Sequence, residues 1–379
     1  MKKSLLALAV LGAFAGAAQA QSSVTIYGIV DTGIAYTSKA VNTTTGNTGS
    51  KFGLNSGVIQ GSRIGFKGVE DLGGGLSAVF NLEAGFKNDT GALDDTKTTN
   101  TLFRRKSVVG LQGGFGSVLL GRQTDFADTI SAYTSVADFG GVTGAVGHNL
   151  DRLEGTRTNN SISYTTANLS GFTGNLIYGF GETAGQTSAG QAFGIGGKYD
   201  NGPLGLGLNY YQSKQGSTPS DTSLLSSAGA GDATNAGNSA AKVLNVVASY
   251  QFGPARVYGN WSRVKQDLSP SVTTTANQTL ANANKADVYE LGTAYSLSPS
   301  LKLLASVQHT RASFKSVDGK GKLTQINLGT DYWLSKRTDL YAFVSNIRAS
   351  DMINTGVYGD TTGSDASQTA VAVGIRHKF

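Results

Sequence analysis

Apolar and polar side chains alternate with a period of two along most of this chain, and this pattern constrains the fold more than any other feature. In residues 75–88 (GLSAVFNLEAGFKN), Leu, Ala and Phe take every second position, and mainly polar residues take the positions between them. Successive side chains of a β-strand point to opposite faces, so the pattern predicts a strand with one apolar and one polar face. About sixteen such segments follow one another, which predicts an all-β protein.

The connections between the predicted strands alternate in length. Short ones, such as 71–75 (DLGGG) and 200–202 (DNG), alternate with long ones rich in Ser, Thr, Asn and Gly, such as 38–56 and 214–240. Seven short and eight long connections fit sixteen antiparallel strands, with both chain ends at the rim of the tight turns. Tight turns at one rim and long loops at the other are typical of transmembrane β-barrels.

The last predicted strand, 367–379 (SQTAVAVGIRHKF), carries Val373, Ile375 and Phe379 on its apolar face, and no later segment is available to cover them. A closed barrel solves this problem, because it pairs the last strand with the first predicted strand, 24–36, and leaves no unpaired edge. Lipid then covers the apolar face. We therefore expect a closed antiparallel transmembrane β-barrel.

The N-terminal residues have the layout of a cleaved secretory signal. Residues 1–20 combine Lys2 and Lys3 with an apolar stretch and end in Ala18-Gln19-Ala20. A membrane-anchoring helix is the alternative, but the apolar run is shorter than the roughly 18 residues that such a helix needs. We therefore expect residues 1–20 to be removed and residues 21–379 to form a single barrel domain.

Composition excludes several other classes. Without residues 1–20, 29 basic residues face 25 acidic ones, and this mild excess does not indicate a nucleic-acid partner. The chain has no cysteine, which excludes a disulfide scaffold, and 52 glycines with only 5 prolines exclude collagen and proline-rich disorder. The stability of this chain must therefore come from extensive regular structure.

A soluble β-sandwich or lectin-like protein is the main alternative fold, because its strands also alternate. However, no second layer is predicted to cover the apolar faces. Aromatic residues also recur near the predicted strand ends, as an interfacial girdle requires. These residues are Tyr27, Tyr164, Tyr178, Tyr199, Tyr211, Tyr289, Trp261, Trp333 and Phe379.

Four motifs resemble those of one known family. They are SVTIYGIVDTGIAY (23–36), GSRIGFKGVEDLGGGLSAVFNLEAGF (61–86), LFRRKSVVGLQGGFGSVLLGRQTDF (102–126) and VAVGIRHKF (371–379). In this order they are similar to the general trimeric porins of Gram-negative outer membranes, of the β-proteobacterial type, and the likeness covers essentially all of residues 21–379.

The resemblance implies a barrel of sixteen strands, a homotrimer, and a third long loop folded into the lumen to narrow the pore. It implies passive passage of ions and small hydrophilic solutes across the outer membrane, among its lipids and lipopolysaccharide. It also implies that the closing Phe379 acts as a signal for the outer-membrane assembly machinery.

The segment 124–158 differs from the other long connections. Phe126, Ile130 and Tyr133 fall at i, i+4 and i+7, which predicts a short helix with an apolar side. A solvated loop has little use for such a side, so we expect this segment to pack against the interior wall of the barrel. The resemblance places the constriction loop at the same position.

Charged residues on the predicted lumen faces are candidates for the pore constriction. The basic candidates are Arg63, Lys67, Arg104, Arg105, Lys106, Arg122 and Arg157, and the acidic ones are Asp31, Glu83, Asp125, Asp128 and Asp138. Opposed rows of such charges would set a transverse field that favours anionic solutes mildly. Any water-filled barrel also carries charged residues on its lumen face. The alternative for each single candidate is therefore an ordinary lumen charge away from the constriction.

Two assignments of residues to the lumen face or the lipid face stay open at this point. Alternation favours Arg104 and Lys106 as lumen residues, whereas the resemblance favours Arg105 and places the basic cluster at Arg63, Arg105 and Arg157. Arg122 shares its predicted face with the apolar Val118 and Leu120, which alternation assigns to lipid.

Other chemistry has little support. The histidines are isolated and no metal or cofactor motif occurs, so we expect neither a cofactor nor a metal. A barrel enzyme would need a histidine beside a serine and an acid, and His148 in the long loop is the sole candidate. An adhesin or a soluble secreted binder is the third class, and it predicts either no ion conductance or no need for detergent.

Overall fold

The computed structural model describes residues 23–42, 45–94, 101–140, 153–185, 187–214, 240–266, 283–314, 319–357, 362–364 and 366–379. The expected signal segment 1–20 and His148 lie outside these residues, so the division into signal and barrel domain stays a prediction. Within the described part of the chain, no helix has both the length and the apolar character to cross a membrane.

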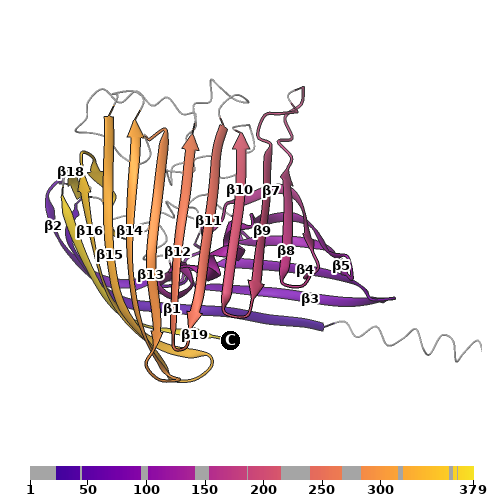
Figure 1. The fold of residues 1–379 in the computed structure, drawn as a ribbon, viewed down its shortest axis with the longest axis horizontal. Coiled ribbons are helices and arrows are strands. Elements are labelled where there is room, and N and C mark those ends of the chain that lie inside the picture. The colour runs from indigo at the N-terminus through magenta and orange to yellow at the C-terminus, as the bar shows by residue number, and fades with distance from the viewer. Residues whose placement is uncertain are drawn as a thin grey trace, which may run out of the picture.

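Antiparallel strands form one closed sheet (Figure 1). The strands are β1 (Ser23–Val41), β2 (Thr48–Ser56), β3 (Arg63–Gly73), β4 (Leu76–Gly85), β5 (Lys106–Gly113), β6 (Gly116–Thr124), β7 (Arg157–Thr166), β8 (Phe172–Gly179), β9 (Ala192–Asn201), β10 (Leu204–Lys214), β11 (Ala240–Phe252), β12 (Ala255–Gln266), β13 (Lys285–Ser296), β14 (Leu301–Phe314), β15 (Gly319–Trp333), β16 (Thr338–Ser350), β17 (Ile353–Asn354), β18 (Thr362–Ser364) and β19 (Ser367–Lys378). The short strands β17 and β18 pair only with each other.

The ring closes through β1. One flank of β1 pairs with β19, and the other flank pairs first with β3 and then with β2. Because β2 and β3 lie end to end on the same flank, the 17 strands of the described sheet occupy sixteen positions. The predicted closed barrel of about sixteen strands is confirmed.

The chain ends meet where closure was expected. Backbone hydrogen bonds of 3.1 Å run in both directions between Gly28 and Phe379. A side chain at position 28 would collide with the Phe379 ring, since a Cβ there would lie 2.4 Å from its Cζ atom. The C-terminus lies toward the rim of the tight turns, which include 202–203 and 253–254 (Figure 1). The assembly-signal role of Phe379 stays a prediction.

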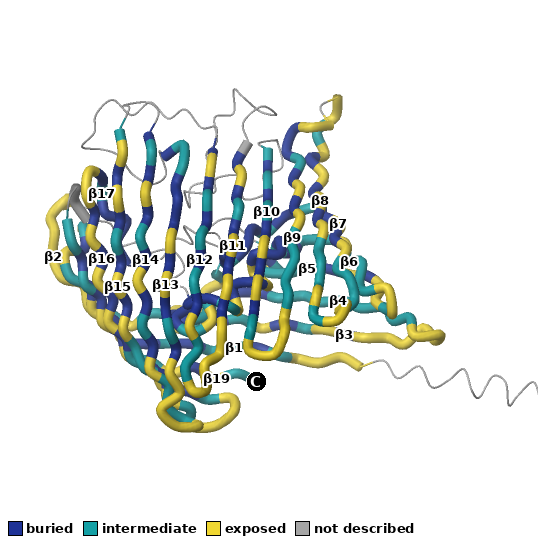
Figure 2. The backbone as a smooth tube through the Cα atoms, viewed as in Figure 1, coloured by how far each residue is buried: buried dark blue, intermediate teal, exposed yellow. Residues whose placement is uncertain are grey.

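The barrel turns its apolar side chains outward and its polar ones inward, the reverse of a soluble protein. Buried and exposed residues alternate along β11 to β16 (Figure 2). On β13, Leu291 is 60% exposed, whereas the neighbouring Glu290 is 6% exposed. This reversal follows from the two-residue period, because one face meets lipid and the other meets the lumen.

Several expectations need correction in detail. The composition of residues 38–56 predicts a long loop, yet β1 continues to Val41 and β2 begins at Thr48, and the two strands pair. Phe52 and Leu54 keep a weak outward alternation there that the surrounding Ser, Thr and Gly obscure. Of the predicted girdle, Tyr27, Tyr211 and Trp333 lie inside the barrel, because each falls on the face opposite the exposed apolar residues of its strand.

Candidate functional site

Residues 125–140, which follow β6, fold into the barrel, and we call them the inner segment. It contains the helix α2 (Ala127–Ile130), the 3-10 helix η1 (Ser131–Tyr133) and the helix α3 (Val136–Phe139). The predicted short helix is confirmed, in three single turns rather than one continuous helix.

Glycines on the inner face of the wall make room for the apolar side chains of this segment. A Cβ at Gly207 of β10 would lie 2.7 Å from the Ile130 side chain, and one at Gly196 of β9 would lie 2.5 Å from the Phe126 ring. Further along, Phe139 packs close to Gly329 of β15. The inner segment therefore lies flat along the wall from β9 to β15, as predicted.

Polar contacts fasten both ends of the inner segment. At its start, Asp125 accepts hydrogen bonds from the backbone N–H of Thr156 at 2.9 Å and from Asn209 at 3.2 Å. At its end, Asp138 pairs with Arg256 of β12 and lies 3.9 Å from the Nζ atom of Lys302. Asp125 and Asp138 thus hold the segment to the wall.

The hydroxyl of Tyr133 adds a fastening point in the middle of the inner segment. It donates to the carboxylate of Asp200, which also pairs with Lys198 at 2.8 Å. Burial and the negative charge of Asp200 raise the pKa of Tyr133. The hydroxyl therefore keeps its proton, and this hydrogen bond, at physiological pH.

Asp31 is also a structural group. Its carboxylate is fully buried and accepts four hydrogen bonds. The donors are the backbone N–H groups of Val58, Ile59 and Gln60, at 3.2, 3.1 and 2.7 Å, and the hydroxyl of Tyr341, at 2.7 Å. Asp31 therefore shapes the turn between β2 and β3, which the end of the inner segment meets at Gly140 against Ile59.

A basic cluster lies on the flank formed by β3, β5 and β7. Its members are Arg63, Arg105 and Arg157. Glu83 of β4 lies between two of them, because its Oε1 atom is 2.6 Å from Nε of Arg105 and 3.9 Å from a terminal nitrogen of Arg63. The hydroxyl of Tyr27 donates to the same carboxylate at 2.9 Å. One carboxylate therefore orients two arginines.

Two carboxylates act on this cluster from the connection between β6 and β7. Asp128 on α2 is exposed, and Glu154 precedes β7. Both interact electrostatically with Arg63 and with the half-buried Arg157. Asp128 thus lies within electrostatic range of the basic cluster. Glu154 was missed, because nothing in its local sequence indicates that the chain returns to the cluster there.

The other basic candidates surround the cluster. Lys67 lies over the ring of Tyr27, at 5.5 Å from its centroid, and Lys106 stands in register with Glu83. Arg104 is buried and pairs with Asp94 at 2.7 Å.

Arg122 is held by hydrogen bonds near the end of β6. It donates to the carbonyl of Arg104 at 2.5 Å and also binds Asn159. It stands in register with Ser107, next to a shift in the pairing of β6 with β7 between Gly121 and Gln123. Alternation could not decide which face these arginines take, because each lies where the strand is irregular. Arg122 is next to the register shift, and Arg104 and Arg105 precede β5, which begins only at Lys106.

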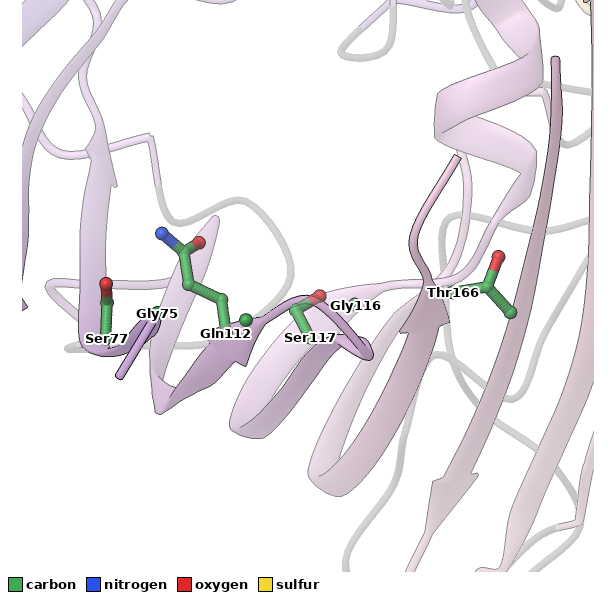
Figure 3. A pocket seen from close by; sticks show the side chains of 7 residues that line it. Gly75, Ser77, Gln112, Gly116, Ser117 and Thr166 are labelled. Atoms are coloured by element: carbon green, nitrogen blue, oxygen red, sulfur yellow. The ribbon is translucent and has the colours of Figure 1, made fainter. Parts of the chain in front are cut away.

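A polar hollow opens near the tight-turn rim (Figure 3). It has a volume of about 340 Å³ and is lined by Gly75, Ser77, Gln112, Gly113, Gly116, Ser117 and Thr166. The figure shows Ser77 and Gln112 pointing into the same open space. Its lining is uncharged, so it contributes space and polarity rather than charge selection. Among the described residues, no cluster of three or more His, Cys, Asp or Glu side chains could hold a metal ion.

Loosening one end of the inner segment is expected to make the channel noisy. Asp138→Asn removes the ion pairs with Arg256 and Lys302. The free energy that holds the end of the inner segment to the wall should fall by about 1 to 3 kcal/mol. Single-channel recording should show added current fluctuations. Asp128→Asn is the matched control, because this carboxylate is exposed to the lumen, and its trace should stay quiet. Equal noise in both variants would contradict the anchoring role of Asp138.

Comparison with known proteins places this geometry in a family. A model described as "Gram-negative porin" matches residues 7–352. Outer membrane porin protein 32 of Delftia acidovorans is 37% identical, and an outer membrane porin protein of Bordetella pertussis is 33% identical, each over the full length of both chains. The solved structure of an anion-selective porin from Comamonas acidovorans has a TM-score of 0.72 and 30% identity, covering 95% of this chain and 100% of that one. The chain therefore belongs to the Gram-negative porin family.

Proposed function

We propose that this protein is a general diffusion porin of the outer membrane, which lets ions and small hydrophilic solutes pass passively and prefers anions. The observation that carries the proposal is the inner segment, which lies along the interior wall and presents Asp128 toward Arg63 and Arg157. A passing solute must cross this charged region, where pore width and lining charge decide its passage.

The sign of the preference follows from the charges around the inner segment. Five basic side chains belong to this flank, namely Arg63, Lys67, Arg105, Lys106 and Arg157, against the three carboxylates of Glu83, Asp128 and Glu154. The surplus favours anions, and the modest size of the surplus makes the preference mild. The structurally similar porin from Comamonas acidovorans, described as anion-selective, supports the same sign.

We further propose a homotrimer that is embedded among outer-membrane lipids and lipopolysaccharide. The resemblance to general porins supports the trimer. The outward apolar face, for example Val373 at 52% exposure, supports contact with lipid. We assign passage rather than catalysis to the barrel, and the porin relatives support this assignment.

Recording from the refolded protein in a planar bilayer tests the proposed function. We expect stepwise current increases, a reversal potential of the sign for anion preference in a salt gradient, and closures in thirds of the full step. A bilayer that stays sealed would contradict the channel function. A reversal potential at zero would contradict only the preference, and closures in single steps would contradict only the trimer.

A further inference from the structure

Apolar side chains lie among the basic residues of the lumen wall, on the flank where β19, β1 and β3 run side by side (Figure 1). The apolar ones are Tyr27 and Ile29 of β1 and Trp333, the last residue of β15. The basic ones are Arg63 of β3 and Lys378 of β19. We call these five residues the mixed patch. All five are half-buried, so each keeps part of its side chain exposed.

Strand parity assigns the mixed patch to the lumen. Each member alternates with the exposed apolar residues of its own strand, for example with Ile26 on β1 and with Ile375 on β19. Trp333 directly follows the outward Tyr332. The lumen face of a porin strand is normally polar. Apolar side chains on this face therefore point to a use that the barrel itself does not require.

Ile29 lies between the two cations of the mixed patch. It stands directly opposite Lys378 on one side and directly opposite Arg63 on the other. Two strand spacings separate the cations, so their Cα atoms are about 10 Å apart. Their long side chains can reach across this distance to one small anion above Ile29. Because the two positive charges act on each other, such an anion would relieve their repulsion.

The guanidinium of Arg63 keeps capacity to bind an anion. Its Nε donates to the carbonyl of Gly61 at 2.9 Å. Its terminal nitrogen is 3.9 Å from Glu83, beyond hydrogen-bond distance, because Arg105 holds that carboxylate at 2.6 Å. The terminal nitrogens of Arg63 are therefore the donors that an incoming carboxylate would meet.

The ammonium of Lys378 lies over the ring of Trp333, at 5.1 Å from the ring centroid. In the described part of the chain, no carboxylate is in ion-pair contact with this ammonium. Asp331 and Asp339 act on it at longer range, but both pair with the buried Arg376, at 3.7 and 3.0 Å. A cation–π contact holds an ammonium in place and leaves its N–H groups able to donate elsewhere. Lys378 is thus a positioned cation beside an aromatic ring.

Tyr27 extends the apolar surface beyond Ile29. The two residues are two positions apart on β1 and therefore share its inner face. The Tyr27 ring covers Gly65 of β3, where a Cβ would lie 2.3 Å from its Cζ atom. The wall is therefore smooth and apolar on one side of the cations, and the Trp333 ring lies on the other side.

We infer that the mixed patch binds aromatic carboxylates, that is, small anions in which one carboxylate is joined to a planar ring. The carboxylate meets Lys378 and Arg63, and the ring lies against Trp333 and Ile29. Aromatic rings prefer offset-stacked or edge-to-face contacts, so the ligand can share the Trp333 ring with the ammonium. An inorganic anion would use only the cations, and an uncharged aromatic only the apolar side chains.

This inference rests on the proposed function, because the ligand reaches the mixed patch through the water-filled passage. It adds a class of solute that a surplus of charge does not select, since such a surplus favours all small anions alike. Passage requires binding that is favourable enough to admit a solute and weak enough to release it. We therefore expect dissociation constants of about millimolar size.

Fluorescence quenching of Trp333 measures binding without the need for a conducting channel. The chain has two tryptophans, so Trp261→Phe leaves Trp333 as the one fluorescent indole. The refolded full chain in detergent is titrated with 4-nitrobenzoate and with 4-nitrobenzyl alcohol, which carries the same quenching ring without the charge. We expect the carboxylate to reach half-quenching at about 10-fold lower concentration, because only the carboxylate engages both cations.

One charge substitution and its control accompany this titration. Lys378→Gln should weaken 4-nitrobenzoate binding by about 5-fold, since it loses a charge-assisted hydrogen bond in partly hydrated surroundings. Lys322→Gln removes a charge from the exposed, outward face of β15, and its quenching curve should match the parent curve. Equal weakening in both variants would show that overall charge, and not the mixed patch, attracts the ligand.

Single-channel recording tests the role of the ring in the pore. Benzoate should reduce the chloride current at about 10-fold lower concentration than acetate, because acetate has no ring to place against the wall. Trp333→Leu should lower this preference for benzoate by about 5-fold, whereas Trp333→Phe, which keeps a ring, should retain most of it. Tyr332→Leu is the matched control on the lipid face of the same strand, and its preference should equal that of the wild type.

Several results would overturn the inference. Equal effects of benzoate and acetate on the wild-type current would show that charge alone selects the anion. Cyclohexanecarboxylate as potent as benzoate would show that any apolar anion suffices. Quenching that is equal for 4-nitrobenzoate and its alcohol would remove Lys378 and Arg63 from the site. Specific quenching in a protein that conducts no ions would instead support the mixed patch and contradict the proposed channel function.

Discussion

Replacing Arg63 and Arg157 together by glutamate is expected to reverse the sign of the reversal potential in a salt gradient. The change turns two positive charges of the cluster into negative ones, beside Glu83 and within electrostatic range of Asp128 and Glu154. Each unit of charge on the wall changes the energy of a passing ion by about 0.5 kcal/mol or less in screened water. The anion-to-cation permeability ratio should therefore fall by about 5- to 30-fold.

The matched control makes the same change of charge at a distant place. Lys336→Glu/Arg337→Glu lies on an exposed tight turn, and we expect its reversal potential to keep the wild-type sign. Arg63→Gln/Arg157→Gln should give an intermediate value, and it also serves if the glutamate variant folds poorly. An unchanged preference in the glutamate variant, with normal conductance, would remove Arg63 and Arg157 from the selective site.

Replacing Asp31 by alanine is expected to destabilise the barrel by roughly 3 to 5 kcal/mol. Three backbone N–H groups of the turn between β2 and β3 lose their acceptor, and the hydroxyl of Tyr341 loses its partner as well. Because Ile59 in this turn meets Gly140, the end of the inner segment should loosen at the same time. The midpoint of denaturant unfolding, followed by circular dichroism, measures the first effect.

Two variants separate the contributions at Asp31. Asp31→Asn keeps one oxygen acceptor for the turn and should lose less than half as much stability as the alanine variant. Tyr341→Phe removes a single hydrogen bond and should cost about 1 kcal/mol. An alanine variant as stable as the wild type would show that water replaces the carboxylate and that Asp31 does not shape the turn.

Alternation predicted the strands well wherever a strand meets lipid on one face. The outward positions of β13 and β19 are the apolar ones that the pattern indicates, for example Leu291 and Val373. The pattern failed where a strand is too polar to show it, as at residues 48–56. It also failed to give a side for residues just outside a strand, such as Arg105, because a period of two has no meaning there.

The candidate acids show a different limit. The sequence identifies Asp31, Asp125 and Asp138 as lumen carboxylates but cannot tell a solvated carboxylate from one that holds backbone N–H groups or a wall arginine. Their donors are distant in the chain: Tyr341 is the partner of Asp31, and Arg256 is the partner of Asp138. Such pairings depend on which strands close the ring and on the path of the inner segment.

The linear chain was enough to predict the membrane barrel, the approximate number of its strands, its family and the inward course of the segment after β6. These properties follow from local periodicity, from the lengths of connections and from motifs, all of which a linear chain displays. The folded barrel was needed to show that Glu83 orients Arg63 and Arg105, that Glu154 acts on the basic cluster, and that Asp31 holds a turn instead. Those outcomes depend on where strands begin and shift register, and on hydrogen bonds between residues that only the closed ring brings together.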